Sequence, residues 1–317
     1  MKKISILVFV LLSSIMMSAQ FQVESFFDEL GNVNLTTQES VNEDGGKMAI
    51  NHRKDDVAWA RVVYRVIDMR FKQNYQLYAP VSPDDPQYRS LFRTMLAAIQ
   101  NGMPVYEKSS NIGEIKPLFA EPMPKEMIPT ILNTDRTGEL GDGNIATSEY
   151  MLLNYDSVAD VMKFNNFAYN TFVRNQLKYI IQEVIFFDRH YSRLFKKITA
   201  IAPLNADNAT FYEGMPVMEA LYGQILFWVP FDAFRPYMAK QYMTPKKNDN
   251  QRVTYDEFFE QRKFSSYIIG TNNVYNRMIP ELVSSKLEGE ALREAIKKEQ
   301  DRVENELLNV EQDLWEY

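Results

Sequence analysis

The chain has 317 residues, of which 45% are hydrophobic and 24% are charged, a composition typical of globular proteins. Its formal net charge of −7 argues against binding to nucleic acid, because phosphates require a basic surface. It contains no cysteine, which excludes disulfides, thiolate metal sites and the attachment of lipid to a cysteine.

The amino-terminal segment has the layout of a secretory signal. Lys2 and Lys3 precede an apolar run, Ile4–Met17, that closes on small residues. We therefore expect a signal peptide over residues 1–19, with cleavage after Ala19. A transmembrane helix needs about 20 apolar residues, so we expect no direct insertion into a membrane after cleavage.

Residues 20–50 are expected to form a flexible arm, because Gly31–Met48 is polar and shows no sustained periodicity. The globular core is expected over residues 51–289. Pro and Gly are frequent between Gly113 and Asn144, which predicts irregular structure and short strands there. This region is also a possible boundary between two lobes, at residues 113–150.

Two helices are predicted in the first part of the core. The first is capped by Asp55 or Asp56, and its apolar residues fall at helical spacing. These residues are Trp59, Val62, Val63 and Val66. The second helix has Asp85 as its N-cap and ends at Asn101-Gly102. Its apolar face consists of Leu91, Phe92, Met95, Leu96 and Ile99.

The second part of the core mixes helical and extended patterns. Apolar spacing predicts a helix through Phe172, Leu177, Ile180, Ile181 and Val184. The composition of Arg193–Leu204 and of Leu221–Phe231 predicts strands. Thr254 and Glu257 fit a capping box that opens a short helix.

The tail, residues 290–317, is predicted to be an amphipathic helix. Its apolar residues recur in steps of three, four or seven, at Leu292, Ile296, Val303, Leu307, Val310, Leu314 and Tyr317. Such a stripe packs either on its own domain or on a neighbouring subunit. We take Leu307, Val310, Leu314, Trp315 and Tyr317 as candidate residues of a protein interface.

The fold class is predicted to be α+β, because helix-like and strand-like stretches are mixed without the regular alternation of a parallel sheet. Two short segments are similar in sequence: VVYRVID, residues 62–68, and QEVIFFD, residues 182–188. This likeness suggests two similar lobes, followed by the carboxy-terminal helix.

One of the two histidines, His190, lies between Asp188 and Ser192. On a strand, each two-residue step separates these side chains by about 6.6–6.8 Å. Proton transfer between a catalytic nucleophile and its base needs a hydrogen-bond distance of about 2.6–3.2 Å. We therefore favour a structural segment. The string GDGNIA, Gly141–Ala146, follows no predicted strand and does not indicate a dinucleotide site. No catalytic residue, cofactor or metal is expected.

Several stretches resemble the family called GldN or PorN, a component of the type IX secretion and gliding machinery of Bacteroidota. The resemblance covers most of the chain in the right order and extends to the closing DLWEY. The stretches are Asp55–Pro80, Ile180–Leu204, Leu226–Asp249, Tyr255–Ile279 and Asp313–Tyr317.

This resemblance implies a non-enzymatic periplasmic subunit. It would form a large ring with copies of itself and with an outer-membrane lipoprotein, GldK or PorK, that holds it at the membrane. It would also contact the periplasmic region of the inner-membrane motor component, GldM or PorM.

Two other functions stay open from the residues alone. One is a solute-binding module hinged at the Pro- and Gly-rich middle of the chain. The other is a periplasmic hydrolase that uses Ser192 or another hydroxyl together with His190.

Overall fold

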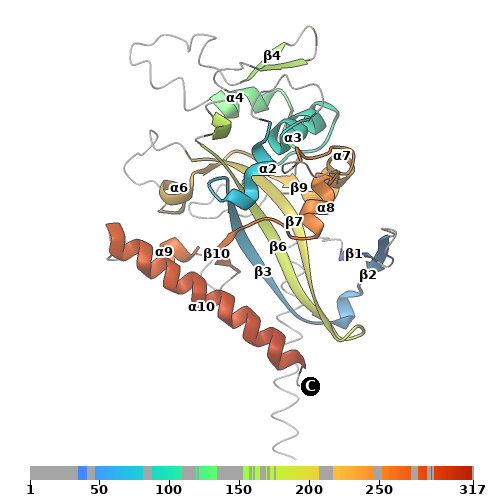
Figure 1. The fold of residues 1–317 in the computed structure, drawn as a ribbon, viewed down its shortest axis with the longest axis vertical. Coiled ribbons are helices and arrows are strands. Elements are labelled where there is room, and N and C mark those ends of the chain that lie inside the picture. Colours follow the sequence, from blue (N-terminus) through green and yellow to red (C-terminus); the bar gives the residue numbers. More distant parts are fainter. Residues whose placement is uncertain are drawn as a thin grey trace, which may run out of the picture.

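The protein is described here by a computed structural model. The described residues are 35–40, 47–80, 88–108, 119, 121–133, 153–156, 159, 161–164, 169, 172–174, 176–206, 217–245, 252–272, 278–283, 287 and 289–315. Both helices and strands are present, in agreement with the predicted α+β class (Figure 1).

A six-stranded sheet forms the centre of the molecule, in the order β10-β3-β6-β7-β8, with β9 also paired to β7. All neighbouring strands are antiparallel. The strands are β3 (Val57–Asp68), β6 (Leu177–Asp188), β7 (Arg193–Asn205), β8 (Gln224–Ile225), β9 (Val229–Pro230) and β10 (Tyr267–Thr271). Two separate hairpins are β1 (Thr36–Ser40) with β2 (Lys47–Asn51), and β4 (Leu153–Asp156) with β5 (Val161–Phe164).

Helices surround this sheet. They are α2 (Tyr75–Tyr78), α3 (Leu91–Gln100), α4 (Met127–Asn133), α6 (Val217–Tyr222), α7 (Phe231–Met238), α8 (Tyr255–Glu260), α9 (Ile279–Val283) and α10 (Gly289–Trp315). Two 3-10 turns, η1 (Lys54–Asp56) and η2 (Lys72–Asn74), flank β3. Figure 1 shows α3, α7 and α8 at one end of the long strands, with α10 crossing the sheet diagonally at the other.

The predicted helices through Val62 and Ile180 are wrong, because these residues lie in the long strands β3 and β6. Both faces of β3 are buried over much of its length. Val62, Tyr64 and Val66 belong to one apolar cluster, and Val63 belongs to the cluster beneath α10. A strand buried on both faces loses the alternation of apolar and polar residues that identifies it.

The strand over Arg193–Leu204 is confirmed as β7. Only two-residue strands, β8 and β9, lie within the strand predicted over Leu221–Phe231, so that prediction holds in part. Within the region expected to be irregular, residues 127–133 form α4, which corrects the prediction there.

The prediction of α3 is confirmed, but its N-cap is wrong. Ser90, not Asp85, precedes the helix, and its hydroxyl accepts from the backbone N–H of Arg93. The helix ends at Asn101, followed by Gly102 at φ 89°, as expected. The capping box of Thr254 and Glu257 opens α8 with both of its hydrogen bonds.

The two segments that suggested similar lobes lie in β3 and β6, which pair with each other over 11 registered positions. They are therefore neighbouring strands of one sheet. Of the expected lobe boundary, residues 113–150, the structure describes 119 and 121–133. Within the range assigned to an amino-terminal arm, the described residues include the antiparallel hairpin β1–β2.

Candidate protein-interaction surfaces

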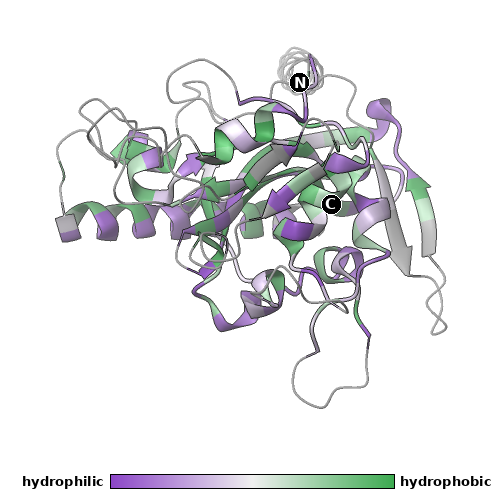
Figure 2. Cartoon of the chain, turned by 90° about the horizontal axis from the view of Figure 1, so that it is seen from above, coloured by the Kyte–Doolittle hydropathy of each residue, from purple (hydrophilic) through white to green (hydrophobic). Residues whose placement is uncertain are grey.

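The carboxy-terminal helix α10 lies against the central sheet. Its residues Ile296, Val303 and Leu307 are buried in a cluster with Val63 of β3 and Ile185 of β6. Hydrophilic and hydrophobic residues alternate along the helix (Figure 2). The part of the apolar stripe from Leu292 to Leu307 therefore packs on its own domain, which is the first of the two arrangements that the sequence left open.

Ion pairs run along the same contact. Oε1 of Glu306 lies 2.8 Å from Nη1 of Arg61, and Oε1 of Glu304 lies 3.6 Å from Nη1 of Arg65. Glu311 lies 3.6 Å from Lys196 of β7. All three carboxylates are more than one-third exposed, so each pair contributes at most about 1 kcal/mol. They connect the second half of α10 to β3 and β7.

The candidate interface residues of the tail have different environments. Leu307 is 9% exposed and faces the sheet, while the next residue, Leu308, is 50% exposed. Val310 is half-buried. The side chains of Leu314 and Trp315, and the whole of Tyr317, lie outside the described residues. The sequence pattern did not distinguish Leu307 from Leu308, because neighbouring residues on a helix differ by about 100° in direction.

A buried carboxylate stands at the centre of the sheet. Glu183 of β6 is 0% exposed, and its Oε2 accepts a 3.2 Å hydrogen bond from Nε of Arg65. Its Oε1 accepts from the guanidinium of Arg262, which also lies over the ring of Phe264. Arg262 adopts a left-handed backbone conformation, φ 50°, just after α8. This arrangement compensates the buried charge and ties α8 to the sheet.

A second polar cluster holds the tip of the β6–β7 hairpin. Nδ1 of His52 donates to Oδ2 of Asp188 at 2.6 Å, and its Nε2 lies 2.8 Å from Oγ1 of Thr37 in β1. The other oxygen of Asp188 accepts from the backbone N–H groups of His190 and Tyr191, at 2.8 and 3.3 Å. The Asp188 carboxylate thus connects the turn with the segment before β3, and His52 extends this connection to the β1–β2 hairpin.

The His52 side chain is fully enclosed, at 0% exposed. Its ring lies 5.0 Å from the ring of Phe186, 4.3 Å from Phe195 and 5.5 Å from Tyr191, measured between centroids. Hydroxyl, imidazole and carboxylate stand in the order found in catalytic triads. Here, however, the aromatic rings enclose the imidazole and Asp188 is occupied with the turn, so the cluster serves to hold three segments together.

The predicted cluster of Asp188, His190 and Ser192 does not form a relay. Asp188 is buried, whereas His190 and Ser192 are exposed in the turn. The Ser192 hydroxyl donates to the backbone carbonyl of Arg189 at 3.4 Å. Sequence reasoning missed His52 as the partner of Asp188, because 136 positions separate the two residues.

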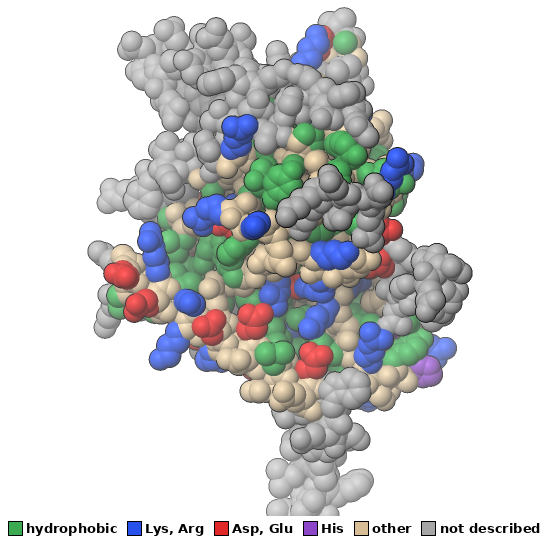
Figure 3. All heavy atoms as spheres, viewed as in Figure 1, with side chains coloured by type: hydrophobic (Ala, Val, Ile, Leu, Met, Phe, Trp, Pro, Cys, Tyr) green, Lys and Arg blue, Asp and Glu red, His purple; other side chains and the backbone are tan. Residues whose placement is uncertain are grey.

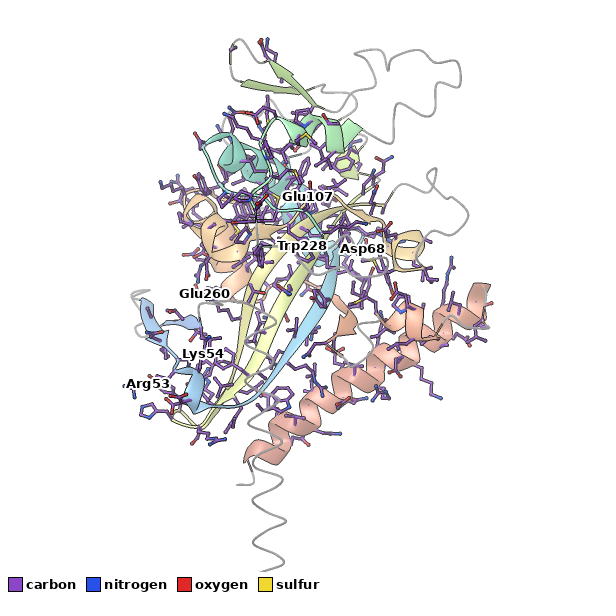
Figure 4. The ribbon with its side chains drawn as sticks, turned by 180° about the vertical axis from the view of Figure 1, so that it is seen from behind. Arg53, Lys54, Asp68, Glu107, Trp228 and Glu260 are labelled. Carbon is purple, nitrogen blue, oxygen red and sulfur yellow. The ribbon has the colours of Figure 1, made fainter. Side chains whose placement is uncertain are left out.

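Exposed cations surround this tip. Arg53 and Lys54 precede β3, while Arg189 and Arg193 flank the turn between β6 and β7. Tyr191 stands among them, 45% exposed. Figure 4 shows Arg53 and Lys54 beside the β1–β2 hairpin, and Figure 3 shows Lys and Arg side chains at the lower right of the molecule. We call Arg53, Lys54, Arg189, Tyr191 and Arg193 the basic tip.

A cleft beside β1 is lined by Thr37, Lys197 and Arg235, among other residues. Lys197 and Arg235 already form ion pairs. Nζ of Lys197 lies 2.9 Å from Oδ2 of Asp232, and Nε of Arg235 lies 2.8 Å from Oδ1 of Asp256. Among the described residues there is no group of three side chains suited to a metal ion. Nor does the described part of the chain contain a helix that is both long and apolar enough to cross a membrane.

The described features are those of an α+β protein with rigid, charged surfaces. The family model for gliding motility associated protein GldN matches residues 52–316. The chain therefore belongs to the GldN family and is a component associated with gliding motility. No curated protein matches the sequence. The family match confirms the resemblance stated from the sequence, and it begins at His52, just after the β1–β2 hairpin.

Proposed function

We propose that the protein is a non-enzymatic structural subunit of the type IX secretion and gliding machinery. In this proposal it lies in the periplasm, exported by the segment over residues 1–19. It assembles into a large ring with copies of itself and with an outer-membrane lipoprotein of the GldK or PorK kind. It also contacts the periplasmic region of an inner-membrane motor component of the GldM or PorM kind.

The observation that carries this proposal is the GldN family match over residues 52–316. The buried clusters at Glu183 and His52 support it, because each uses a polar network to hold segments in place. A subunit of a large assembly needs such stiffness, since a preformed surface loses less conformational freedom on binding.

The carboxy-terminal end of α10 is the proposed contact surface, with Val310, Leu314, Trp315 and Tyr317 as its apolar residues. Leu307 is not part of the exposed surface itself. Its side chain is buried against the sheet and holds this part of α10 in place. The exposed Leu308 extends the apolar surface outward. Aromatic residues are enriched in protein interfaces, which is why Trp315 and Tyr317 are included in the proposed surface.

The test is an affinity purification of the tagged full chain from its native envelope after mild cross-linking. Co-purified proteins are identified by mass spectrometry and particle size is measured by gel filtration. We expect a lipoprotein and a membrane-anchored motor subunit in very large particles. A reproducible monomer without envelope partners would contradict the proposal.

A matched pair of variants makes this test specific to the helix. Leu308→Asp changes an exposed residue of α10, and Leu282→Asp changes an exposed leucine of α9, at 41% exposed. We expect Leu308→Asp to reduce the recovery of partners and Leu282→Asp to leave it unchanged. Circular dichroism of both variants verifies that each remains folded.

A further inference from the structure

We propose that the outer side of α10 in one copy binds the basic tip of the next copy. This inference rests on the proposed self-assembly into a ring and names the two surfaces that meet. The outer side of α10 is represented by Asp301, Glu304 and Leu308, which we call the acidic ridge. These residues share one face of the helix, because they are spaced three and four positions apart.

The acidic ridge lies on a stretch of α10 in which acidic residues outnumber basic ones, although Lys297 and Lys298 stand one turn before Asp301. Between residues 301 and 312, the acidic residues are Asp301, Glu304, Glu306 and Glu311, and the only basic residue is Arg302. A cationic surface placed against the ridge complements this excess of acidic residues.

Much of the ridge remains accessible. The Glu304 side chain is 55% exposed despite its distant ion pair with Arg65, and Asp301 is exposed. Leu308 is 50% exposed and adds an apolar contact point at the carboxy-terminal end of the ridge. Acidic side chains are visible along the lower left of the molecule, over α10 (Figure 3).

The basic tip has the complementary composition. Its four cations outnumber the three nearby carboxylates, those of Asp55, Asp56 and the buried Asp188. An exposed tyrosine surrounded by arginines is the composition of binding hot spots, and Tyr191 provides a ring for Leu308 to pack on. Lysine and arginine side chains can meanwhile approach the ridge carboxylates without being buried.

The tip is also rigid before binding. Asp188 holds the turn that carries Tyr191, and the backbone N–H of Arg189 donates to the carbonyl of Asp56 at 2.8 Å. The turn and the 3-10 turn η1 therefore present their cations in a fixed arrangement. A preformed surface of this kind binds with a smaller loss of conformational entropy.

The two surfaces are different parts of the molecule, so the contact is heterologous. Repeated heterologous contacts generate a ring if the rotation closes and a filament if it does not. A contact between the tip and the ridge of successive copies thus supplies what a ring requires and what a two-fold contact does not.

Site-directed cross-linking tests this contact directly, because the chain has no cysteine of its own. His190→Cys labels the tip and Asn305→Cys labels the ridge, and neither removes a proposed contact residue. The two variants, carrying different tags, are produced together in the native envelope and treated with a short bis-maleimide. We expect an adduct that contains both tags. Lys240→Cys, an exposed position after α7, serves as the matched control and should give no adduct with Asn305→Cys.

Charge reversal makes the result specific. Arg53→Glu with Arg189→Glu, added to the tip-labelled copy, should lower the adduct about tenfold, the value expected when two exposed charge pairs become repulsive. Asp301→Arg with Glu304→Arg in the other copy should restore it. An adduct that is unchanged by charge reversal would overturn the electrostatic assignment.

The envelope purification separates failure of this inference from failure of the proposed function. If large particles with the lipoprotein form but the adduct is absent, the subunit function stands and the tip-to-ridge contact is wrong. An adduct between His190→Cys and a different protein would also overturn the contact between copies. If no particles and no adduct form, both proposals fail.

Discussion

His52 and Asp188, which are 136 positions apart, are joined by a 2.6 Å hydrogen bond between Nδ1 and Oδ2, and neither side chain is more than 1% exposed. The bond connects the segment before β3 to the end of β6, while Thr37 extends the connection to β1. Removing one member of such a buried pair leaves the other without a partner.

We predict that Asp188→Ala lowers the free energy of unfolding by about 3 kcal/mol, because His52 and two backbone N–H groups lose their acceptor. Asp188→Asn keeps an oxygen for the turn and should cost less. Urea denaturation followed by circular dichroism measures both. Equal losses for the two variants would show that the turn does not depend on this side chain.

The environment of Arg262 predicts which of two substitutions at this position destabilises the protein more. Arg262→Ala and Arg262→Gly both remove the charged partner of Glu183, so both should destabilise the protein. Glycine adopts the φ of 50° without strain, so the alanine variant should be the less stable by roughly 0.5–1 kcal/mol. Thermal melts of the two proteins test this. The reverse order would contradict a strained backbone at this position.

Adjacent leucines on α10 should respond in opposite ways to the same substitution. Leu307→Asp places a charge in the cluster between the helix and the sheet and should lower stability by about 3 kcal/mol or more. Leu308→Asp changes a half-exposed side chain, so it should cost at most about 1 kcal/mol, from the lower helix propensity of aspartate and its closeness to Glu304 and Glu311. Denaturation of both purified variants compares them. A similar loss in both would place Leu308 in a packed environment.

Buried tyrosines predict that the fold weakens in alkali. Burial raises the pKa of Tyr169 to about 12 and that of Tyr222 to about 12. In the unfolded chain a tyrosine ionises near pH 10. Between about pH 10 and 12 the unfolded state therefore releases protons that the folded state retains, and stability falls as pH rises.

The measurement is the free energy of unfolding as a function of pH, together with the absorbance of ionised tyrosine. We expect Tyr169→Phe to reduce the loss between about pH 10 and 12 by roughly 2–3 kcal/mol. Tyr75→Phe is a suitable control, because Tyr75 is 38% exposed. A pH profile that is identical in the wild type and in Tyr169→Phe would contradict the buried environment of Tyr169.

Local signals predicted the elements that depend on local chemistry. The capping box at Thr254 and the amphipathic pattern of the tail correspond to α8 and α10. The same approach failed for β3 and β6. In β3 the apolar residues Val62, Val63 and Val66 imitate helical spacing, because they serve clusters on both faces of the sheet. A periodicity argument assumes one buried face, and the central strands have two.

The sequence also predicted the candidate interaction surfaces only in part. The stripe along α10 was visible in the sequence, but which leucine faces the sheet depends on the rotation of the helix about its axis. The pairing of His52 with Asp188 depends on β3 lying beside β6 over 11 registered positions. No local pattern encodes that pairing, so the basic tip became apparent only from the structure.

The diagonal course of α10 has a mechanical consequence. The helix is attached to β3 through Arg61 and Arg65, contacts Ile185 of β6 and reaches β7 at Lys196. Ile268 of β10 packs in the same cluster, so force applied along the helix axis is distributed over four strands of the sheet. The protein should resist force applied through its carboxy-terminal end better than force that pulls β8 from the other edge of the sheet, where it pairs with β7 at two positions.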